Sequence, residues 1–287
     1  MESSGILYIV ATPIGNLKDV SQRALDVLAG VDFIAAEDTR HSRILLHHFG
    51  IAKPLISLHQ HNEDRVSANV LDRVAAGESA ALISDAGTPL INDPGYPLVA
   101  AARSRGIRVS PIPGPCAFIA ALSASGLPTD RVRFEGFPPR TASSRRKLLE
   151  TLLGERATTV FYESSHRIVE FCEDISLVIP EDRAVCIARE LTKIHETIVT
   201  TSAGSVGGLT RGTPYADKGE FVVMIAGSAE VANNDNLTQE QLHTLTVLLD
   251  ECSLKTAVAL TCKLAGARKE VAYQMALKLK SAQEGAS

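Results

Sequence analysis

Three loops rich in proline, glycine and small polar residues each follow an apolar run of the kind that forms a buried strand. The loops span residues 12–16, 85–95 and 113–117. In open α/β sheets, ligands bind outside the carboxyl ends of the parallel strands, where such loops lie. Proline stiffens a loop, and glycine lets the backbone approach a ligand closely. Pro-Gly pairs also make plain turns, but three such loops favour a preformed pocket.

Two clusters of opposite charge stand at the ends of further predicted strands. One is residues 37–40, Glu-Asp-Thr-Arg, and the other is residues 189–193, Arg-Glu-Leu-Thr-Lys, with Glu196 in the following strand. Adjacent opposite charges at a strand end either form a salt-bridged scaffold or orient a substrate. The sequence leaves both interpretations open.

Several common catalytic signatures are absent from the sequence. It contains no Gly-x-Gly-x-x-Gly, no Gly-x4-Gly-Lys-Ser/Thr and no Gly-x-Ser-x-Gly motif. His59 and His61 lack a third candidate metal ligand nearby, which disfavours a metal site. Ser164 and Ser165 precede a predicted helix, so their hydroxyls are expected to cap it rather than act as nucleophiles. These observations argue against NTPases, hydrolases and metalloenzymes.

Composition indicates an ordinary soluble protein. The 287 residues are 45% hydrophobic and 22% charged, which suits two domains with room for a small third. The five cysteines never form a Cys-x-x-Cys pair, which argues against a disulfide framework or a zinc ribbon. No apolar run is long enough to span a membrane, and no secretory signal is recognisable. We therefore expect a cytoplasmic protein.

The net charge of −4 conceals two basic segments. Residues 131–147 and 252–280 each hold six Lys or Arg residues against one Glu. Two such segments on an acidic body either form a phosphate-binding surface or are solvated faces, and charge alone does not decide between these.

The first part of the chain has the pattern of an α/β domain. Predicted strands alternate with predicted helices, the strands being 6–10, 31–36, 55–58, 80–84 and 108–112, and the helices 21–28, 39–49, 62–76 and 97–105. Continuous apolar strands separated by helices are typical of a parallel sheet covered on both faces. We place this domain at residues 1–115.

The chain changes character at residues 113–128, which we interpret as the hinge into a second α/β domain, 116–228. Its predicted elements suggest a mixed sheet: helices 116–125, 145–153 and 165–175, with strands 158–162, 184–188, 197–201 and 221–226. After a polar linker, 229–236, helices are predicted at 238–250, 253–265 and 269–280. This tail, 237–281, resembles a helix-turn-helix, with a helical dimerisation cap as the alternative.

Six short motifs occur in order along the chain: Pro13-Ile14-Gly15-Asn16-Leu17, Glu37-Asp38-Thr39-Arg40, Ser84-Asp85-Ala86-Gly87-Thr88-Pro89 with Asp93-Pro94-Gly95, Pro113-Gly114-Pro115-Cys116-Ala117, Phe161-Tyr162-Glu163-Ser164-Ser165-His166-Arg167 and Ala188-Arg189-Glu190-Leu191-Thr192-Lys193. Together they resemble the ribosomal RNA small subunit methyltransferase I branch of the tetrapyrrole methylase superfamily. The resemblance runs from about residue 6 to 227, and the helical tail is also similar.

This resemblance implies two α/β domains with S-adenosylmethionine bound in the cleft between them, and a homodimer. It implies 2′-O-methylation of a cytidine ribose in the decoding region of 16S rRNA, presented as small-subunit rRNA or as the assembled 30S subunit. The cofactor-binding residues it implies are Pro13, Gly15, Asp85, Gly87, Thr88, Pro89, Pro113, Gly114, Pro115, Cys116 and Ala117. Other members of the superfamily methylate porphyrin rings on the same fold, but the motifs after the hinge favour RNA.

Methyl transfer to a 2′-hydroxyl requires in-line placement of the reactants and removal of the hydroxyl proton. We hypothesise that Lys193, Glu190 or Glu196 handles that proton. Six arginines are candidates for holding the phosphates or ribose of the substrate, namely Arg40, Arg140, Arg145, Arg146, Arg167 and Arg189.

Aromatic residues are only 5% of the chain and tryptophan is absent, so a base-stacking surface is poorly supplied. We therefore expect recognition through phosphate contacts and RNA shape. Two alternatives stay open: a methyltransferase for tetrapyrroles or other small molecules, and a regulator that senses S-adenosylmethionine and binds nucleic acid.

Overall fold

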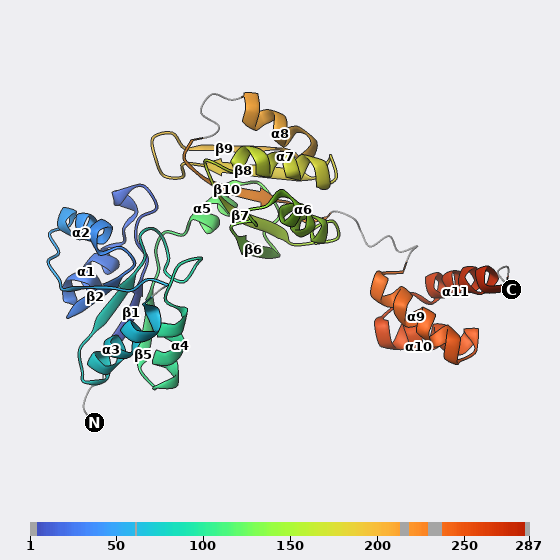
Figure 1. Cartoon of the computed structure of the whole chain (residues 1–287), viewed down its shortest axis with the longest axis horizontal. Helices are drawn as coiled ribbons and strands as arrows, with labels where there is room; N and C mark the ends of the chain where they lie inside the picture. The colour runs from blue at the N-terminus through green and yellow to red at the C-terminus, as the bar shows by residue number, and fades with distance from the viewer. Residues whose placement is uncertain (1–4, 61, 213–217, 229–236, 285–287) are drawn as a thin grey trace. The chain divides into compact units, whose positions relative to one another are not determined.

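The computed structural model describes residues 5–60, 62–212, 218–228 and 237–284. The chain divides after Gly227 into two compact units. The larger unit contains two five-stranded sheets, and the smaller one is helical (Figure 1). The predicted linker 229–236 and His61 lie outside the described residues.

The first sheet is entirely parallel, with strand order β3-β2-β4-β1-β5. Its strands are β1 (Ile6–Val10), β2 (Phe33–Ala36), β3 (Leu55–Ser57), β4 (Ala80–Ile83) and β5 (Arg108–Ile112). Helices α1 (Gln22–Gly30) and α2 (Thr39–His48) pack on one face, and α3 (Glu63–Ala75) and α4 (Tyr96–Ser104) pack on the other. A short 3₁₀ helix, η1 (Leu17–Asp19), follows β1. The two-sided parallel sheet predicted from the apolar runs is confirmed.

The second sheet is mixed, with strand order β6-β7-β10-β8-β9. Its strands are β6 (Val132–Gly136), β7 (Thr158–Ser164), β8 (Ala184–Arg189), β9 (Thr197–Ser202) and β10 (Glu220–Ile225). Only the β6–β7 pair is parallel among the described ladders of this sheet. Helices α6 (Ala142–Thr151), α7 (Ile168–Val178) and α8 (Ala203–Gly212) cover one face, and α5 (Ala117–Ala124) packs on the other.

The smaller unit consists of α9 (Gln239–Glu251), α10 (Leu254–Ala265) and α11 (Lys269–Glu284). Thr238 and Gln241 form a capping box at the start of α9, and Ser253 accepts a hydrogen bond from the Thr256 amide to begin α10. Gly266 ends α10 in the left-handed region, with φ of 65°. The unit has its own apolar core, made by Leu245, Ala257, Val258, Ala267, Ala272 and Ala276.

Three local predictions in the second half of the larger unit need correction. Strand β7 continues to Ser164 and α7 begins only at Ile168, with Arg167 as its N-cap, so Ser164 and Ser165 do not cap this helix. Helix α6 begins three residues before its predicted start. Helix α8 was not predicted because its sequence contains four glycines, which disfavour helices. Burial of Ala203 and Val206 against the core stabilises α8 nevertheless.

In the described part of the chain, no helix is long and apolar enough to cross a bilayer. The same residues contain no group of three or more His, Cys, Asp or Glu placed to hold a metal ion.

Candidate active site

The loops that follow β1, β4 and β5 are joined by hydrogen bonds, because these strands are neighbours in the first sheet. The Thr12 amide donates to the Gly87 carbonyl at 2.8 Å, and the Gly87 amide donates back to Thr12 at 3.0 Å. The Thr88 hydroxyl donates to the carbonyl of Pro115 at 2.9 Å. The three loops therefore form one connected surface at the carboxyl ends of the strands.

Two glycines allow the loops to approach this closely. Gly87 has φ of 83°, a conformation that strains any residue with a Cβ atom. A Cβ atom at Gly114 would lie 2.9 Å from the Cβ of Ala11, which is closer than such atoms approach in proteins. The backbone of the loops after β1 and β5 can come together only because this position lacks a side chain.

A cavity of about 450 Å³ lies in the larger unit, and residues from both sheets line it. From the N-terminal half come Ile14, Glu37, Asp85–Thr88 and Ile91–Asp93, and from the second half Cys116, Ala117, Phe137, Tyr162–Ser164, Leu191 and Glu220–Val222. Among the predicted cofactor-binding residues, Asp85, Gly87, Thr88, Cys116 and Ala117 line this cavity. The others, Pro13, Gly15, Pro89, Pro113, Gly114 and Pro115, belong to the same three loops without lining it.

Carboxylates give the cavity its electrostatic character. Glu37, Asp85, Asp93, Glu163 and Glu220 all line it. Burial raises the pKa of Glu37 above its ordinary value, and the negative charges of Asp93 and Asp85 raise it further. Burial likewise raises the pKa of Asp93. The cavity therefore favours a cationic ligand, whose charge would offset this repulsion.

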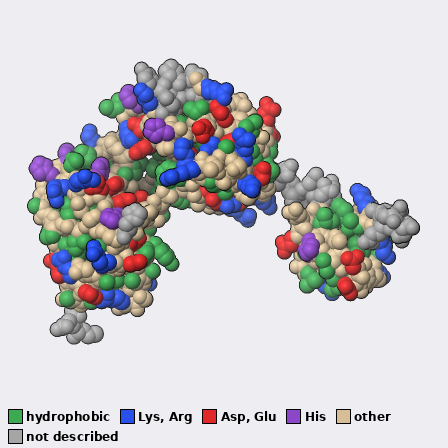
Figure 2. All heavy atoms as spheres, in the orientation of Figure 1, with side chains coloured by type: hydrophobic (Ala, Val, Ile, Leu, Met, Phe, Trp, Pro, Cys, Tyr) green, Lys and Arg blue, Asp and Glu red, His purple; other side chains and the backbone are tan. Residues whose placement is uncertain are grey.

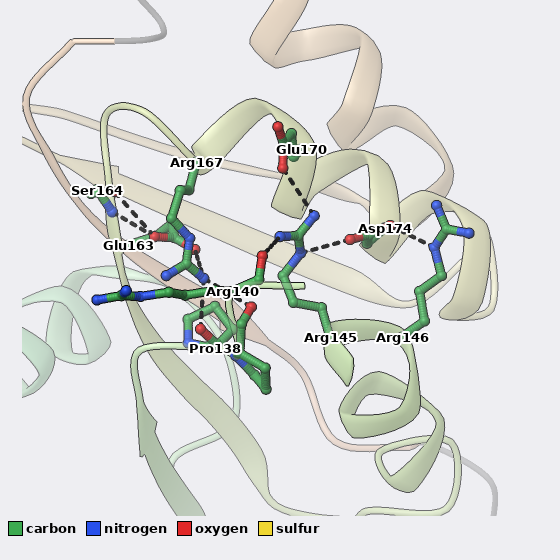
Figure 3. Close-up of polar contacts among 10 residues, drawn as sticks. Pro138, Arg140, Arg145, Arg146, Glu163, Ser164, Arg167, Glu170 and Asp174 are labelled. Carbon is green, nitrogen blue, oxygen red and sulfur yellow. Dashed lines mark hydrogen bonds and ion pairs between the residues drawn. The ribbon is translucent and has the colours of Figure 1, made fainter. Parts of the chain in front are cut away.

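Glu163 stands at the end of β7 with its side chain fully buried. One carboxylate oxygen accepts a hydrogen bond from the Ser164 amide at 2.8 Å, and the other lies 3.2 Å from the Arg167 guanidinium. Burial raises the pKa of Glu163 even though Ser164 and Arg167 both oppose the shift. Arg167 also donates to the carbonyls of Pro138 and Pro139, at 2.6 and 3.0 Å (Figure 3).

Arg145 is predicted to bind substrate, and the structure instead places it in the interior. Its side chain is 3% exposed and lies between Asp174, at 2.7 Å, and Glu170, at 3.2 Å (Figure 3). It also donates to the carbonyl of Arg140 at 2.8 Å. A guanidinium enclosed in this way is held by protein partners and links α6 to α7. Arg146 pairs with the other oxygen of Asp174 at 2.7 Å but is half-exposed.

The remaining arginine candidates come from three different segments of the chain. Arg40 is exposed and forms an ion pair with Asp38, the residue that caps α2. Arg189 donates to the carbonyl of Lys218 at 2.6 Å. Arg140 is exposed, and Figure 3 shows its side chain extended on the side of Glu163, away from Asp174. On the face shown in Figure 2, Lys and Arg side chains gather over the region of α6 and β7.

Two members of the predicted catalytic trio meet. The Lys193 amine donates to Glu190 at 2.8 Å and to Glu220 at 3.1 Å. Partial burial opposes the charge of Lys193, but these hydrogen bonds raise the pKa of the amine above its ordinary value. Burial opposes ionisation of Glu190, yet the bond from Lys193 holds the pKa of that carboxyl below its ordinary value. Glu196 precedes β9, and its carboxylate accepts from the Thr192 amide at 2.6 Å.

The Lys193 side chain packs on the loop after β1, since a Cβ atom at Gly15 would lie 2.6 Å from its Cγ. The loop that carries Lys193 has a strained backbone. Glu190 and Thr192 have φ of 50° and 66°, which residues other than glycine rarely adopt. Leu90 and Asn92, in the loop after β4, have φ of 72° and 66°. Strain of this kind clusters at functional sites, where the surrounding structure holds it in place.

Comparison with known proteins agrees with this architecture. Residues 6–207 match the family described as Tetrapyrrole (Corrin/Porphyrin) Methylases, and residues 235–280 match the RsmI C-terminal HTH domain. The chain belongs to the tetrapyrrole methylase family. Within that family it groups with proteins named ribosomal RNA small subunit methyltransferase I.

Three of these relatives illustrate the likeness. This tetrapyrrole methylase family member is 47% identical to the Haemophilus influenzae protein over 96% of its own length and 97% of the relative. It is 49% identical to the Escherichia coli O157:H7 protein, over 96% of each chain. It is 47% identical to the Pseudomonas aeruginosa protein, over 96% and 98%. The identity of the family predicted from the six motifs is confirmed.

Solved structures show the same fold at low sequence identity. The methyltransferase CobJ is 18% identical with a TM-score of 0.57, covering 79% of this chain and 95% of that one. Diphthine synthase is 16% identical with a TM-score of 0.56, covering 77% and 90%. The predicted α/β fold of the tetrapyrrole methylase type, followed by C-terminal helices, is confirmed.

Proposed function

We propose that this protein uses S-adenosylmethionine to methylate the 2′-oxygen of a cytidine ribose in the decoding region of 16S rRNA. The observation that carries the proposal is the carboxylate-lined cavity under three glycine-containing loops, in a chain whose relatives are named ribosomal RNA small subunit methyltransferase I. The substrate is small-subunit rRNA or the assembled 30S subunit, the protein acts in the cytoplasm, and two copies form a homodimer.

The residues that line the cavity fit S-adenosylmethionine. Its sulfonium and ammonium groups are cationic, and Glu37, Asp85 and Asp93 supply nearby negative charge. Gly87 lines the cavity and has no side chain to keep a ligand from its backbone, and Gly114 lets the loop after β5 pack on the loop after β1. The residues that would hold it are the lining members of the predicted set, Asp85, Gly87, Thr88, Cys116 and Ala117.

When bound, S-adenosylmethionine supplies a methyl group made electrophilic by the adjacent sulfonium. The chain's own residues must then orient the ribose and manage its proton. Lys193, held protonated by its two carboxylate partners, suits stabilisation of the negative charge that develops on the 2′-oxygen. Of the two carboxylates in the predicted trio, Glu190 contacts Lys193, whereas Glu196 accepts a hydrogen bond from the Thr192 amide. Glu190 is therefore the better candidate to accept the ribose proton.

The test is transfer of a tritiated methyl group from S-adenosylmethionine, with small ribosomal subunits, naked rRNA and a porphyrinogen offered in parallel. Label in RNA that maps to an alkali-resistant ribose supports the proposal. Label only in the porphyrinogen would assign a small-molecule methyltransferase, and binding of RNA without any transfer would assign a regulator.

A further inference from the structure

Four aromatic rings come together beside the cavity, although aromatic residues are few in this chain. Phe118 and Phe134 stack with ring centroids 4.7 Å apart. The Tyr162 ring lies edge-to-face with the rings of Phe134 and Phe137, at centroid distances of 5.0 and 6.0 Å. The composition predicted a poor supply of stacking surfaces, and the fold compensates by gathering these rings from α5, β6 and β7 and the loop after β6.

Phe137 is the most exposed member of this cluster, since Phe118, Phe134 and Tyr162 are each partly buried. It is 50% exposed and lines the cavity together with Tyr162. Gly136, with φ of 67°, turns the chain at the end of β6 and places Phe137 there. A Cβ atom at Gly136 would lie 2.6 Å from Oδ1 of Asn92, so this turn contacts the loop after β4. A planar, half-exposed ring thus stands where the loops of both sheets meet.

Two arginines fix the segment that carries this ring. Arg167 holds the carbonyls of Pro138 and Pro139, and Arg145 holds the carbonyl of Arg140 (Figure 3). Arg145 is itself fixed by Asp174. Pro138 is buried, and proline limits backbone freedom in the same segment. An apolar ring at the end of a segment held this firmly is ready to bind without first losing conformational freedom.

The next charged side chain in the segment is the exposed cation Arg140. A flat aromatic face followed three residues later by a cation matches the chemistry of a nucleotide, which has a planar base and an anionic phosphate. We propose that Phe137 is the stacking surface for the nucleobase of the substrate nucleotide, with Arg140 meeting an adjacent phosphate. This inference rests on the proposed function and identifies how that site holds its substrate.

Kinetics of three variants test the stacking surface. Loss of one base–aromatic stack corresponds to a fall of about 5- to 150-fold in kcat/KM, expected for Phe137→Ala with small ribosomal subunits. Phe137→Tyr keeps the ring and should retain the wild-type rate, and saturating S-adenosylmethionine in every assay removes any contribution of cofactor affinity, because Phe137 also lines the cavity. Leu177→Ala, at a 69% exposed apolar position on α7, is the matched control. If Phe137→Ala keeps kcat/KM within twofold of wild type, the proposal is wrong.

Fluorescence gives a readout that does not depend on activity. The chain contains no tryptophan, so Phe137→Trp and the control Leu177→Trp each introduce a single indole. A ten-nucleotide oligocytidine RNA should quench the indole at position 137 and leave the one at 177 unchanged. Equal quenching at the two positions, or none, would overturn the stacking surface.

The two experiments separate this inference from the function on which it rests. Selective quenching at position 137 in a protein that transfers no methyl group to RNA would support the stacking surface and contradict the proposed reaction. Methyl transfer to RNA that is unaffected by Phe137→Ala would support the proposed reaction and contradict the stacking surface.

Discussion

Glu37 and Asp93 are placed where their charges repel each other in the free protein. Burial raises both pKa values, so the folded protein binds more protons than the unfolded chain does above their ordinary values of 4.5 and 3.8. Their contribution to stability is therefore complete at low pH and is lost as the pH rises through the raised values. A cationic ligand reverses this cost, because it binds the ionised carboxylates.

Glu37→Gln should accordingly stabilise the free protein and weaken its ligand binding. Because Glu37 is only half-buried, solvent screening keeps the gain in unfolding free energy below about 1 kcal/mol at neutral pH. We expect the dissociation constant for S-adenosylmethionine to rise about tenfold, which equals about 1.4 kcal/mol. Thermal unfolding measures the stabilisation and calorimetric titration measures the loss of affinity. Between pH 4 and 8, both should increase as the pH rises. The exposed control Glu150→Gln should show neither.

Lys193 carries the second prediction at this scale. Removal of a preorganised cation that faces developing negative charge should lower kcat about 100- to 1,000-fold in Lys193→Ala. Binding of S-adenosylmethionine should stay intact, since Lys193 does not line the cavity. Lys193→Arg keeps the positive charge and should lower kcat less than Lys193→Ala does. Single-turnover methyl transfer measures the effect, and a near-normal rate in Lys193→Ala would exclude it from the mechanism.

Among the elements, α6 and α7 are joined by two arginines that share one carboxylate. Both Arg145 and Arg146 lie 2.7 Å from Asp174, but their side chains are 3% and 48% exposed. Arg145→Ala removes the buried partner of Asp174 and leaves only the half-exposed Arg146 beside it, so it should cost up to about 3–5 kcal/mol of unfolding free energy. Arg146→Ala should cost less than about 1 kcal/mol. Urea unfolding followed by circular dichroism measures the unfolding free energy of both variants. Equal losses would contradict the assignment of Arg145 as the buried partner of Asp174.

The elements themselves were largely predictable, and the roles of several side chains were not. Apolar runs and caps located β1, β5 and α10 correctly, because hydrophobic period and capping residues are local signals. Loops after strands in a parallel sheet predicted where the cavity lies. Helix α8 could not be predicted from local signals, because its glycines disfavour a helix and tertiary packing stabilises it.

Long-range partners explain what the sequence could not show. Arg145 belongs to a basic segment that suggests a solvated or phosphate-binding face, but Asp174, 29 residues further along the chain, draws it into the interior. Phe137 looks unremarkable in the sequence, since its importance depends on Tyr162 and on the loop after β4. Glu37 was recognised as polar and adjacent to a strand, but only the fold brings it to the cavity beside Asp93.

At the scale of the whole molecule, the helices α9, α10 and α11 form a separate unit with its own core. A chain ending at Gly227 should therefore still bind S-adenosylmethionine with a dissociation constant within about twofold of wild type. Its kcat/KM for small ribosomal subunits should fall by more than about tenfold, because the tail's six Lys and Arg residues are lost.

The salt dependence of this truncated chain gives the control. Fewer phosphate contacts should make the fall of affinity with ionic strength shallower than in the full chain. If cofactor binding and RNA methylation decline equally, the tail is structural and does not bind RNA.

The order of strands in the second sheet has a consequence for how the protein is made. β10 comes last in sequence among the described strands, yet it lies in the middle of the sheet and pairs with both β7 and β8. The first sheet is complete in the chain at Ile112, so we expect it to fold while synthesis continues. Until residue 225 leaves the ribosome, β7 and β8 each present an unpaired edge, and nascent chains at this stage are the ones most exposed to aggregation.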